Sequence, residues 1–71
     1  MSSYLIVIEK GPKSYGAYCP DLPGCVAAAK TRMKAEKLIR EAIAAYLEFM
    51  RERGEPIPPP SSAGSVVRVA A

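Results

Sequence analysis

Residues 31–54 read TRMKAEKLIREAIAAYLEFMRERG, and this stretch carries the strongest secondary-structure signal in the chain. Its apolar residues recur at the i, i+3, i+4, i+7 spacing of an amphipathic helix. They are Ala35, Leu38, Ile39, Ala42, Ile43, Tyr46, Leu47 and Met50. Thr31 is the predicted N-cap and Gly54 the predicted stop, since glycine readily adopts the left-handed backbone that ends helices. On the charged face, Glu36 precedes Arg40 in the order that supports an i, i+4 ion pair.

Three short strands are predicted before this helix. Residues 4–9 are β-branched and aromatic, and residues 11–14 then supply turn chemistry. Residues 15–19 return as a second strand, and the two prolines and one glycine of residues 20–24 break it. Residues 25–29 run back as a third strand. Together these segments predict a three-stranded antiparallel meander.

The predicted chain continues beyond the helix. Residues 56–60 favour an extended polyproline conformation, and residues 66–69 are β-branched and predict a final strand. The order is therefore β-β-β-α-β, an α+β fold, and we expect residues 1–71 to form a single domain.

The first predicted strand is apolar on both of its faces. Side chains alternate along a strand, so Tyr4, Ile6 and Ile8 point one way while Leu5 and Val7 point the other. One helix can cover only one face of the sheet. Leu5 and Val7 therefore mark a face that we expect to bury against a second copy or a partner.

The length of the chain also favours oligomerisation. A domain of 71 residues buries only about 60% of the surface of its unfolded chain, so its core is small. Small domains are often reinforced by disulfides, metals or oligomerisation. Two cysteines are too few for a disulfide framework, and the absence of histidine leaves no usual zinc quartet. Oligomerisation is the remaining option.

The residues needed for catalysis are not present in a recognisable pattern. The usual nucleophile and base pairings rely on histidine, which the chain lacks. Glu9 and Asp21 are the only acids before the helix, so no converging carboxylates are predicted. We therefore expect a binding protein and not an enzyme, with no catalytic residue, no cofactor and no metal site.

Two other residue groups have alternative interpretations. Cys19 and Cys25 flank the loop at residues 20–24 and could form a disulfide or a two-thiolate metal contact, but free cysteines usually act as small buried hydrophobes. Tyrosines on the predicted sheet, with lysines near the strand ends, could form a base-stacking platform with a phosphate-binding fringe, but strand tyrosines are more often packing residues. The residues concerned are Tyr4, Tyr15, Tyr18, Lys10, Lys13 and Lys30.

Residues 20–25 read PDLPGC, and this motif between two strands is the most specific in the chain. Together with other positions, it makes the sequence resemble the HicB-like antitoxin family over almost its whole length. Those positions are Tyr15, Ala17, Thr31, Ala35, Glu41, Ala42, Ile43, Gly54, Glu55, Ile57, Pro58, Pro60 and Ser61. The resemblance implies a degenerate, partial ribonuclease H-like fold without a nuclease site. It also implies the role of a type II antitoxin that neutralises a small HicA-like mRNA interferase, and assembly as a homo-oligomer, dimer or tetramer.

The sequence departs from the family pattern at two places. The start of the helix is basic, because Lys30 and Lys34 stand near Thr31 where the family commonly has acidic residues. No residues follow Ala71 to form the DNA-binding domain that many members carry, so direct DNA binding is not expected.

We assign partner binding to the loop residues Asp21, Leu22 and Pro23, since exposed loops often carry function, and the alternative role for the same residues is to shape the turn. Two alternatives to an antitoxin stay open: a nucleic-acid-binding module that uses tyrosine and lysine side chains, and a purely structural homo-oligomer. The first residues lack a signal-peptide pattern and no apolar run approaches the roughly 20 residues of a membrane span. We expect a cytoplasmic protein without membrane partners.

The composition further predicts a heat-adapted source. The chain contains no Asn, Gln, His or Trp, and depletion of thermolabile amides is a trend of proteins from thermophiles. We expect thermal unfolding, followed by circular dichroism, to give a midpoint above the roughly 45–65 °C range of mesophilic domains. A midpoint within that range would contradict the hypothesis.

Overall fold

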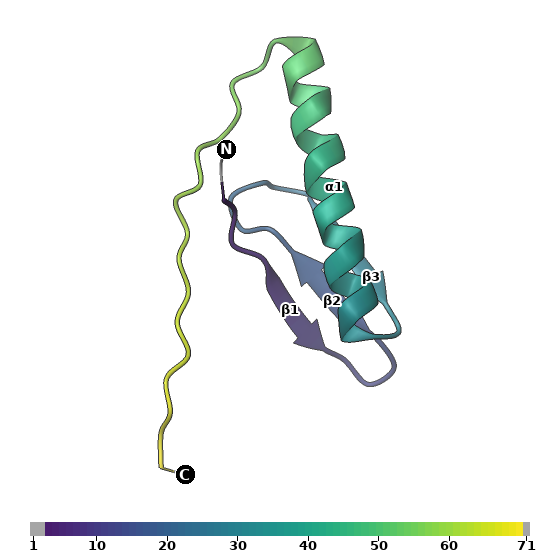
Figure 1. Ribbon diagram of the computed structural model, residues 1–71, viewed down its shortest axis with the longest axis vertical. Coiled ribbons are helices and arrows are strands. Elements are labelled where there is room, and N and C mark those ends of the chain that lie inside the picture. The colour runs from purple at the N-terminus through teal and green to yellow at the C-terminus, as the bar shows by residue number, and fades with distance from the viewer. Residues whose placement is uncertain (1–2, 71) are drawn as a thin grey trace.

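The computed structural model describes residues 3–70, which form a three-stranded sheet covered on one face by one helix (Figure 1). The elements are β1 (Val7–Lys10), β2 (Tyr15–Tyr18), β3 (Val26–Ala29) and α1 (Arg32–Arg53). Neighbouring strands are antiparallel in the order β1-β2-β3. The predicted α+β class, with its meander followed by one helix, is confirmed.

Both ends of α1 are capped as the sequence predicts. The Thr31 hydroxyl accepts a hydrogen bond of 3.1 Å from a backbone N–H in the first turn. Gly54 has φ of 69°, and its N–H donates to Arg51 at 3.1 Å while the N–H of Glu55 donates to Met50 at 3.0 Å. This pair of bonds is the Schellman arrangement. Within the described residues, no helix is long and apolar enough to cross a membrane.

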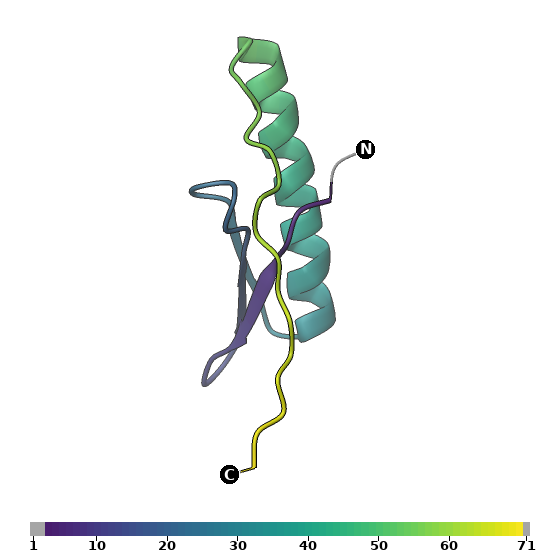
Figure 2. The ribbon, with the colours of Figure 1, turned by 90° about the vertical axis from the view of Figure 1, so that its left-hand side faces the viewer.

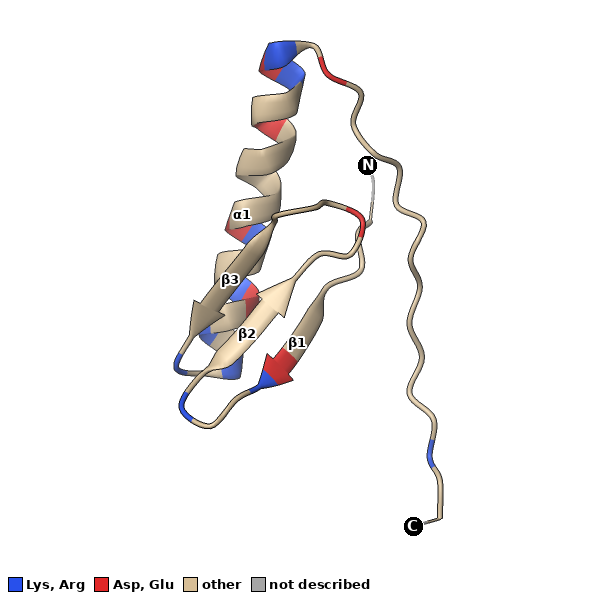
Figure 3. Cartoon of the chain, turned by 180° about the vertical axis from the view of Figure 1, so that it is seen from behind, with Lys and Arg blue, Asp and Glu red and all other residues tan. Residues whose placement is uncertain are grey.

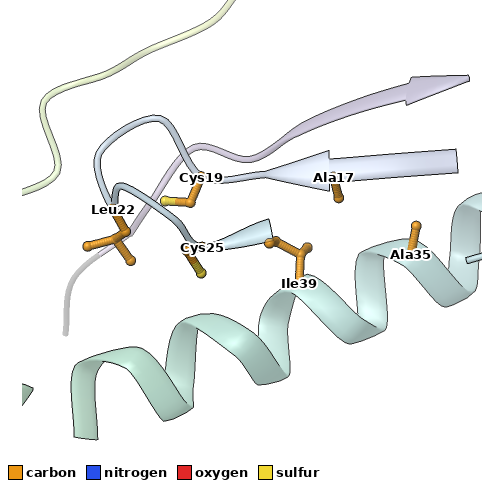
Figure 4. Close-up of a cluster of buried hydrophobic side chains, with 6 residues drawn as sticks. All are labelled: Ala17, Cys19, Leu22, Cys25, Ala35 and Ile39. Atoms are coloured by element: carbon orange, nitrogen blue, oxygen red, sulfur yellow. The ribbon is translucent and has the colours of Figure 1, made fainter. Parts of the chain in front are cut away.

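The core is a small cluster between the sheet and the helix (Figure 4). Ala17 lies opposite both Ile8 and Ala27 in the strand register, so these side chains share the face that α1 covers. The helix contributes two fully buried residues, Ala35 and Ile39. An alanine from each layer lets the helix lie close to the sheet. The complete cluster is Ala17, Cys19, Leu22, Cys25, Ala35 and Ile39.

The loop between β2 and β3 forms one end of the core. Leu22 is fully buried, and Cys19 and Cys25 are buried beside it (Figure 4). Backbone bonds hold this shape: Cys19 donates to Cys25 at 3.2 Å, Leu22 donates to Cys19 at 3.1 Å, and Cys25 donates to Leu22 at 3.1 Å. The loop thus serves as part of the packed interior.

The first strand is shorter than predicted. Residues 4–6, which the sequence assigns to it, lie outside the ladder. Val7 pairs with Tyr18, so a longer ladder would need partners in the residues just after β2. There the chain turns, and Pro20 has no N–H to donate to a neighbouring strand.

The final strand predicted at residues 66–69 is not formed. Residues 55–70 follow α1 as a tail without regular secondary structure among the described residues. The side chains of Val66, Val67 and Val69 are 96%, 75% and 77% exposed. The reason is the lack of a neighbour, because an extended segment becomes a strand only when another strand takes its backbone hydrogen bonds. The ribonuclease H relationship stays a prediction.

We predict that Leu22→Ala removes 2–5 kcal/mol, roughly, from the free energy of unfolding, because the truncation leaves a cavity in a very small core. Denaturant unfolding followed by circular dichroism measures this loss. Met33→Ala is the matched control: Met33 is 83% exposed, and the change should stay within about 0.5 kcal/mol. A loss below about 1 kcal/mol for Leu22→Ala would show that the loop is not part of the core.

Candidate interaction surface

The face of the sheet opposite α1 is largely apolar, and within the described residues no helix covers it (Figure 2). Val7, Tyr18 and Val26 are cross-strand neighbours in the register. They point away from the helix, because side chains alternate and the adjacent set of strand residues packs on the core. Figure 2 shows the helix on one side of the sheet, with no helix or strand on the other among the described residues. We call this surface the outer face; it comprises Leu5, Val7, Glu9, Gly16, Tyr18, Val26 and Ala28.

The outer face exposes two large apolar side chains. Tyr18 is 39% exposed and Val26 is 66% exposed. Glu9 is the one charged residue that belongs to the face. The central part of the face is therefore neutral, apolar and aromatic, the composition typical of the centre of a protein interface.

Leu5 and Val7 point as the sequence predicts. Tyr4, Ile6 and Ile8 pack against the core, whereas Leu5 and Val7 are half-buried on the opposite side. The tail covers part of Leu5: a Cβ atom built on Gly64 would lie 3.3 Å from a methyl carbon of this leucine. The role of Leu5 and Val7 as an oligomer face stays a prediction.

The three predicted partner-binding residues have different environments. Leu22 is fully buried, so its side chain is not available to a partner in this conformation. Asp21 is occupied by contacts with the tail, and Pro23 is exposed at the tip of the loop. Of the three, Pro23 alone presents its side chain to solvent without another structural role. Partner binding by the loop stays a prediction.

Asp21 attaches the tail to the loop through four hydrogen bonds. Its Oδ2 atom accepts from the backbone N–H groups of Ser61 at 3.0 Å and Ser62 at 3.1 Å. Its Oδ1 atom accepts from the two serine hydroxyls at 2.8 and 2.9 Å. The backbone N–H of Ser62, followed by the hydroxyl of Ser61, lowers the pKa of Asp21 to about 2. The carboxylate is thus ionised at neutral pH and matched to four donors.

Cys19 and Cys25 are both free and buried. Burial raises the pKa of the Cys25 thiol, and the neighbouring Cys19 raises it further. A buried thiol with a raised pKa is a poor nucleophile, so its environment favours packing over reactivity. Within residues 3–70, no group of three or more His, Cys, Asp or Glu side chains is placed to hold a metal ion.

The tyrosines do not share one face of the sheet. Tyr4 and Tyr15 pack against the core on the helix side, and Tyr18 lies on the outer face. The Tyr4 hydroxyl donates to the carbonyl of Pro58 and so contacts the tail. A stacking platform needs several aromatic rings on one surface, and this arrangement does not supply one.

Two features of the surface were missed by the sequence interpretation. Tyr18 and Val26 were not assigned to a common patch, although counting the alternation back from Ala17 and Ala27 would have placed them together. The Asp21 contacts with the serines span 40 and 41 residues along the chain, and no local pattern indicates them.

Comparison with known proteins identifies a family model and a solved structure that match most of the chain. The family model for the HicB-like antitoxin of bacterial toxin–antitoxin systems matches residues 4–70. A chain of the solved HicA3 and HicB3 toxin–antitoxin complex is similar in structure, with a TM-score of 0.69 and 35% sequence identity. That match covers 83% of this chain and 70% of the other.

Two further relatives are similar in sequence. The UPF0150 protein Ta0767 of Thermoplasma acidophilum is 39% identical over 56 residues, which covers 78% of this chain and 81% of that protein. An uncharacterized 14.9 kDa protein from the rep-hol intergenic region of Haemophilus phage HP1 is 40% identical over 55 residues. This second match covers 78% of the chain but 41% of the phage protein.

We predict that the attachment of the tail depends on the charge of Asp21. Because its pKa is depressed to about 2, the contribution of this carboxylate is complete above the ordinary pKa of about 4 and is lost as pH falls through about 2. Asp21→Asn should release the tail at neutral pH. Backbone NMR relaxation of Ser61 and Ser62 measures the release of the tail as faster local motion. It applies both to the unmodified chain at low pH and to Asp21→Asn at neutral pH.

Glu55→Gln is the matched control for this prediction. It removes a carboxylate of the same tail whose contact is an exposed ion pair with Arg53 at 3.2 Å. Ser61 and Ser62 should keep their order in this variant. Unchanged order of both serines in Asp21→Asn would show that another contact holds the tail.

Proposed function

Because the chain belongs to the HicB-like antitoxin family of bacterial toxin–antitoxin systems, we propose that it binds and neutralises a small toxin that cleaves messenger RNA. The observation that carries this proposal is the exposed part of the outer face around Tyr18 and Val26. It presents Tyr18 and Val26 on a paired, hydrogen-bonded sheet. A surface held in this way loses little conformational entropy when a partner covers it.

The chemistry of the outer face suits inhibition by occlusion. Tyrosine supplies a large contact area with a polar tip, and it is enriched among residues that dominate binding energy. Val26 and Ala28 add a flat apolar surface beside it. A small nuclease bound there would be unable to reach a long RNA. Inhibition of this kind needs no catalytic activity from this chain.

The distribution of charge also favours the outer face. Many of the basic residues lie around the end of the molecule where the β1–β2 turn meets the start of α1 (Figure 3). They are Lys10, Lys13, Lys30, Arg32, Lys34 and Lys37. RNA-cleaving toxins need positive charge to bind their substrate, so a basic surface on the inhibitor would repel them. The outer face avoids this repulsion, because its one charged residue is Glu9.

The same basic end favours nucleic-acid binding as a second candidate function. Phosphate contacts from clustered Lys and Arg supply most of non-specific affinity for nucleic acids. This candidate lacks the stacking tyrosines, because Tyr4 and Tyr15 pack toward the core. It therefore rests on charge alone, and we place it second.

To test the proposed function, the tagged chain is purified from its own host and each stoichiometric small partner is assayed for messenger-RNA cleavage with and without the chain. We expect one such partner, with its cleavage silenced by the chain. Val26→Arg should weaken this complex by about 10- to 100-fold, because it places a cation on the outer face against a partner that is itself basic. Isothermal titration calorimetry of the purified pair measures the change.

Val26→Ile and Met33→Arg are the controls. The first keeps an apolar side chain on the outer face, and the second places the same cation at an 83% exposed methionine on α1. Both should retain affinity within a factor of about 3. Full affinity in Val26→Arg would remove the outer face as the binding site. Absence of a nuclease partner, together with RNA binding that weakens steeply with salt, would favour the second candidate.

A further inference from the structure

A groove lies beside the outer face, between the start of β3 and the C-terminal half of α1. Gly24 and Val26 line it from the side of β3 and the loop before it, and Ala42, Ala45 and Phe49 line it from the helix side. Val26 also belongs to the outer face, so the two apolar surfaces meet at this residue. A partner that covers the outer face can continue into the groove around β3, because β3 is an edge strand.

The small residues of the groove leave room for a side chain from another molecule. Gly24 has no side chain, and Ala42 and Ala45 carry one methyl group each. Phe49 stands beside them and is 55% exposed. Aromatic side chains contribute much apolar area when they are buried, and this ring keeps half of its area in water. An apolar side chain placed against Phe49 would remove that area from water.

The ring of Phe49 is restrained from one side. The guanidinium carbon of Arg53 lies 5.3 Å from the centre of the ring, which is within the range of a cation–π contact. Arg53 also forms an ion pair of 3.2 Å with Glu55, so its charge is compensated within this chain. A restrained ring loses little side-chain freedom when a partner contacts it, and this favours binding.

The rim of the groove is acidic. Glu41 and Glu48 stand four residues before and three residues after Ala45, and Glu52 stands three residues after Phe49. Residues three and four apart are neighbours on the surface of a helix. The three glutamates are exposed, and they form one row of carboxylates beside the apolar residues of the groove.

The acidic rim can attract a cation from a partner. Glu48 pairs with Arg51 at 2.8 Å, whereas Glu41 and Glu52 make no ion pair within the part of the chain that the structure describes. Residues 41–50 include no lysine or arginine. Many basic residues gather around the start of α1 instead (Figure 3). The groove therefore has the sign of charge that complements a cationic partner.

We propose that the groove is a second part of the toxin-binding surface, and that it holds a toxin segment with one large apolar side chain flanked by Lys or Arg. This contact rests on the proposed function, because the partner is the same. The apolar side chain lies on Ala42 and Ala45 against Phe49, and its cationic neighbours face Glu41 and Glu52. A toxin that cleaves RNA needs its cations for the phosphates, so pairing them with carboxylates withdraws them from the substrate.

The groove on the other flank of α1 lacks these properties. Ile6, Arg40 and Ala44 are among its lining residues, and none of its lining residues belongs to the outer face. The charge of Arg40 stands at its rim, in an ion pair of 3.2 Å with Glu36. This second groove has neither the continuity nor the acidic rim, so it supplies the positions for matched controls.

The first experiment tests the groove with the chain alone. A blocked pentapeptide, with one tryptophan between two pairs of lysines, is titrated into the isotope-labelled chain and followed by NMR chemical shifts. We expect shift changes at Gly24, Ala45 and Phe49 that diminish as salt rises. The same peptide with glutamates in place of lysines should leave these signals unchanged. Equal changes with both peptides, or changes confined to the other groove, would overturn the proposal.

The second experiment measures the affinity of the purified toxin for two tryptophan variants by isothermal titration calorimetry. Ala45→Trp should weaken the complex by about 10- to 100-fold, because the added ring occupies the groove. Ala44→Trp places the same ring in the other groove and should retain affinity within a factor of about 3. Both alanines are exposed, so circular dichroism of the two variants should match that of the unmodified chain.

A pair of charge reversals tests the acidic rim in the same assay. Glu41→Lys should weaken the complex by about tenfold, because it turns attraction into repulsion beside the groove. Glu36→Lys makes the same change of net charge on the other flank of α1, and it should retain affinity within a factor of about 3. Equal losses in the two variants would show that net charge alone governs binding, which would overturn the pairing with the rim.

The outcomes separate the groove from the proposed function. If Val26→Arg weakens the complex while Ala45→Trp binds fully, the groove is excluded and the outer face remains the toxin-binding site. Equal losses in Ala45→Trp and Ala44→Trp would also exclude the groove, since the effect would then belong to the helix as a whole. Absence of any nuclease partner would overturn the proposed function and this contact together, whatever the peptide shows.

Discussion

The structure depends on the packing of α1 against one face of a three-stranded sheet. Ala35 and Ile39 of the helix close over Ala17, and the small side chains allow the two layers to approach. This contact removes one apolar face of the sheet from water. The other face cannot be covered by the same helix, so a single chain of this design leaves Tyr18 and Val26 exposed. Because the fold has two layers, the sheet and the helix, the outer face of the sheet stays available for binding.

The loop between β2 and β3 connects the core to the tail. Its leucine is fully buried at the end of the core, and the preceding aspartate faces outward to accept four hydrogen bonds from Ser61 and Ser62. The adjacent residues Asp21 and Leu22 therefore have different structural roles. Leu22 stabilises the loop from within, and Asp21 uses that fixed position to hold a segment 40 residues away.

Three surfaces of the molecule thus differ in polarity and charge. The outer face is apolar, the groove between β3 and α1 is apolar with an acidic rim, and the end near the start of α1 is basic (Figure 3). A flat apolar partner, a cationic segment and a phosphate backbone are recognised by different forces, namely apolar burial, apolar burial joined with charge, and charge alone. A chain of 71 residues can present all three because the core of its described part uses so few side chains.

The sequence alone determined the helix with both caps, the three strands, the family, and the division of Tyr4, Ile6 and Ile8 from Leu5 and Val7. Each of these follows from local periodicity, capping chemistry or a short motif. The burial of Leu22, the Asp21 contacts, the unpaired final segment and the separation of the tyrosines were decided only by the tertiary structure. They depend on which distant segments meet, and the spacing of residues along a chain carries no record of such contacts.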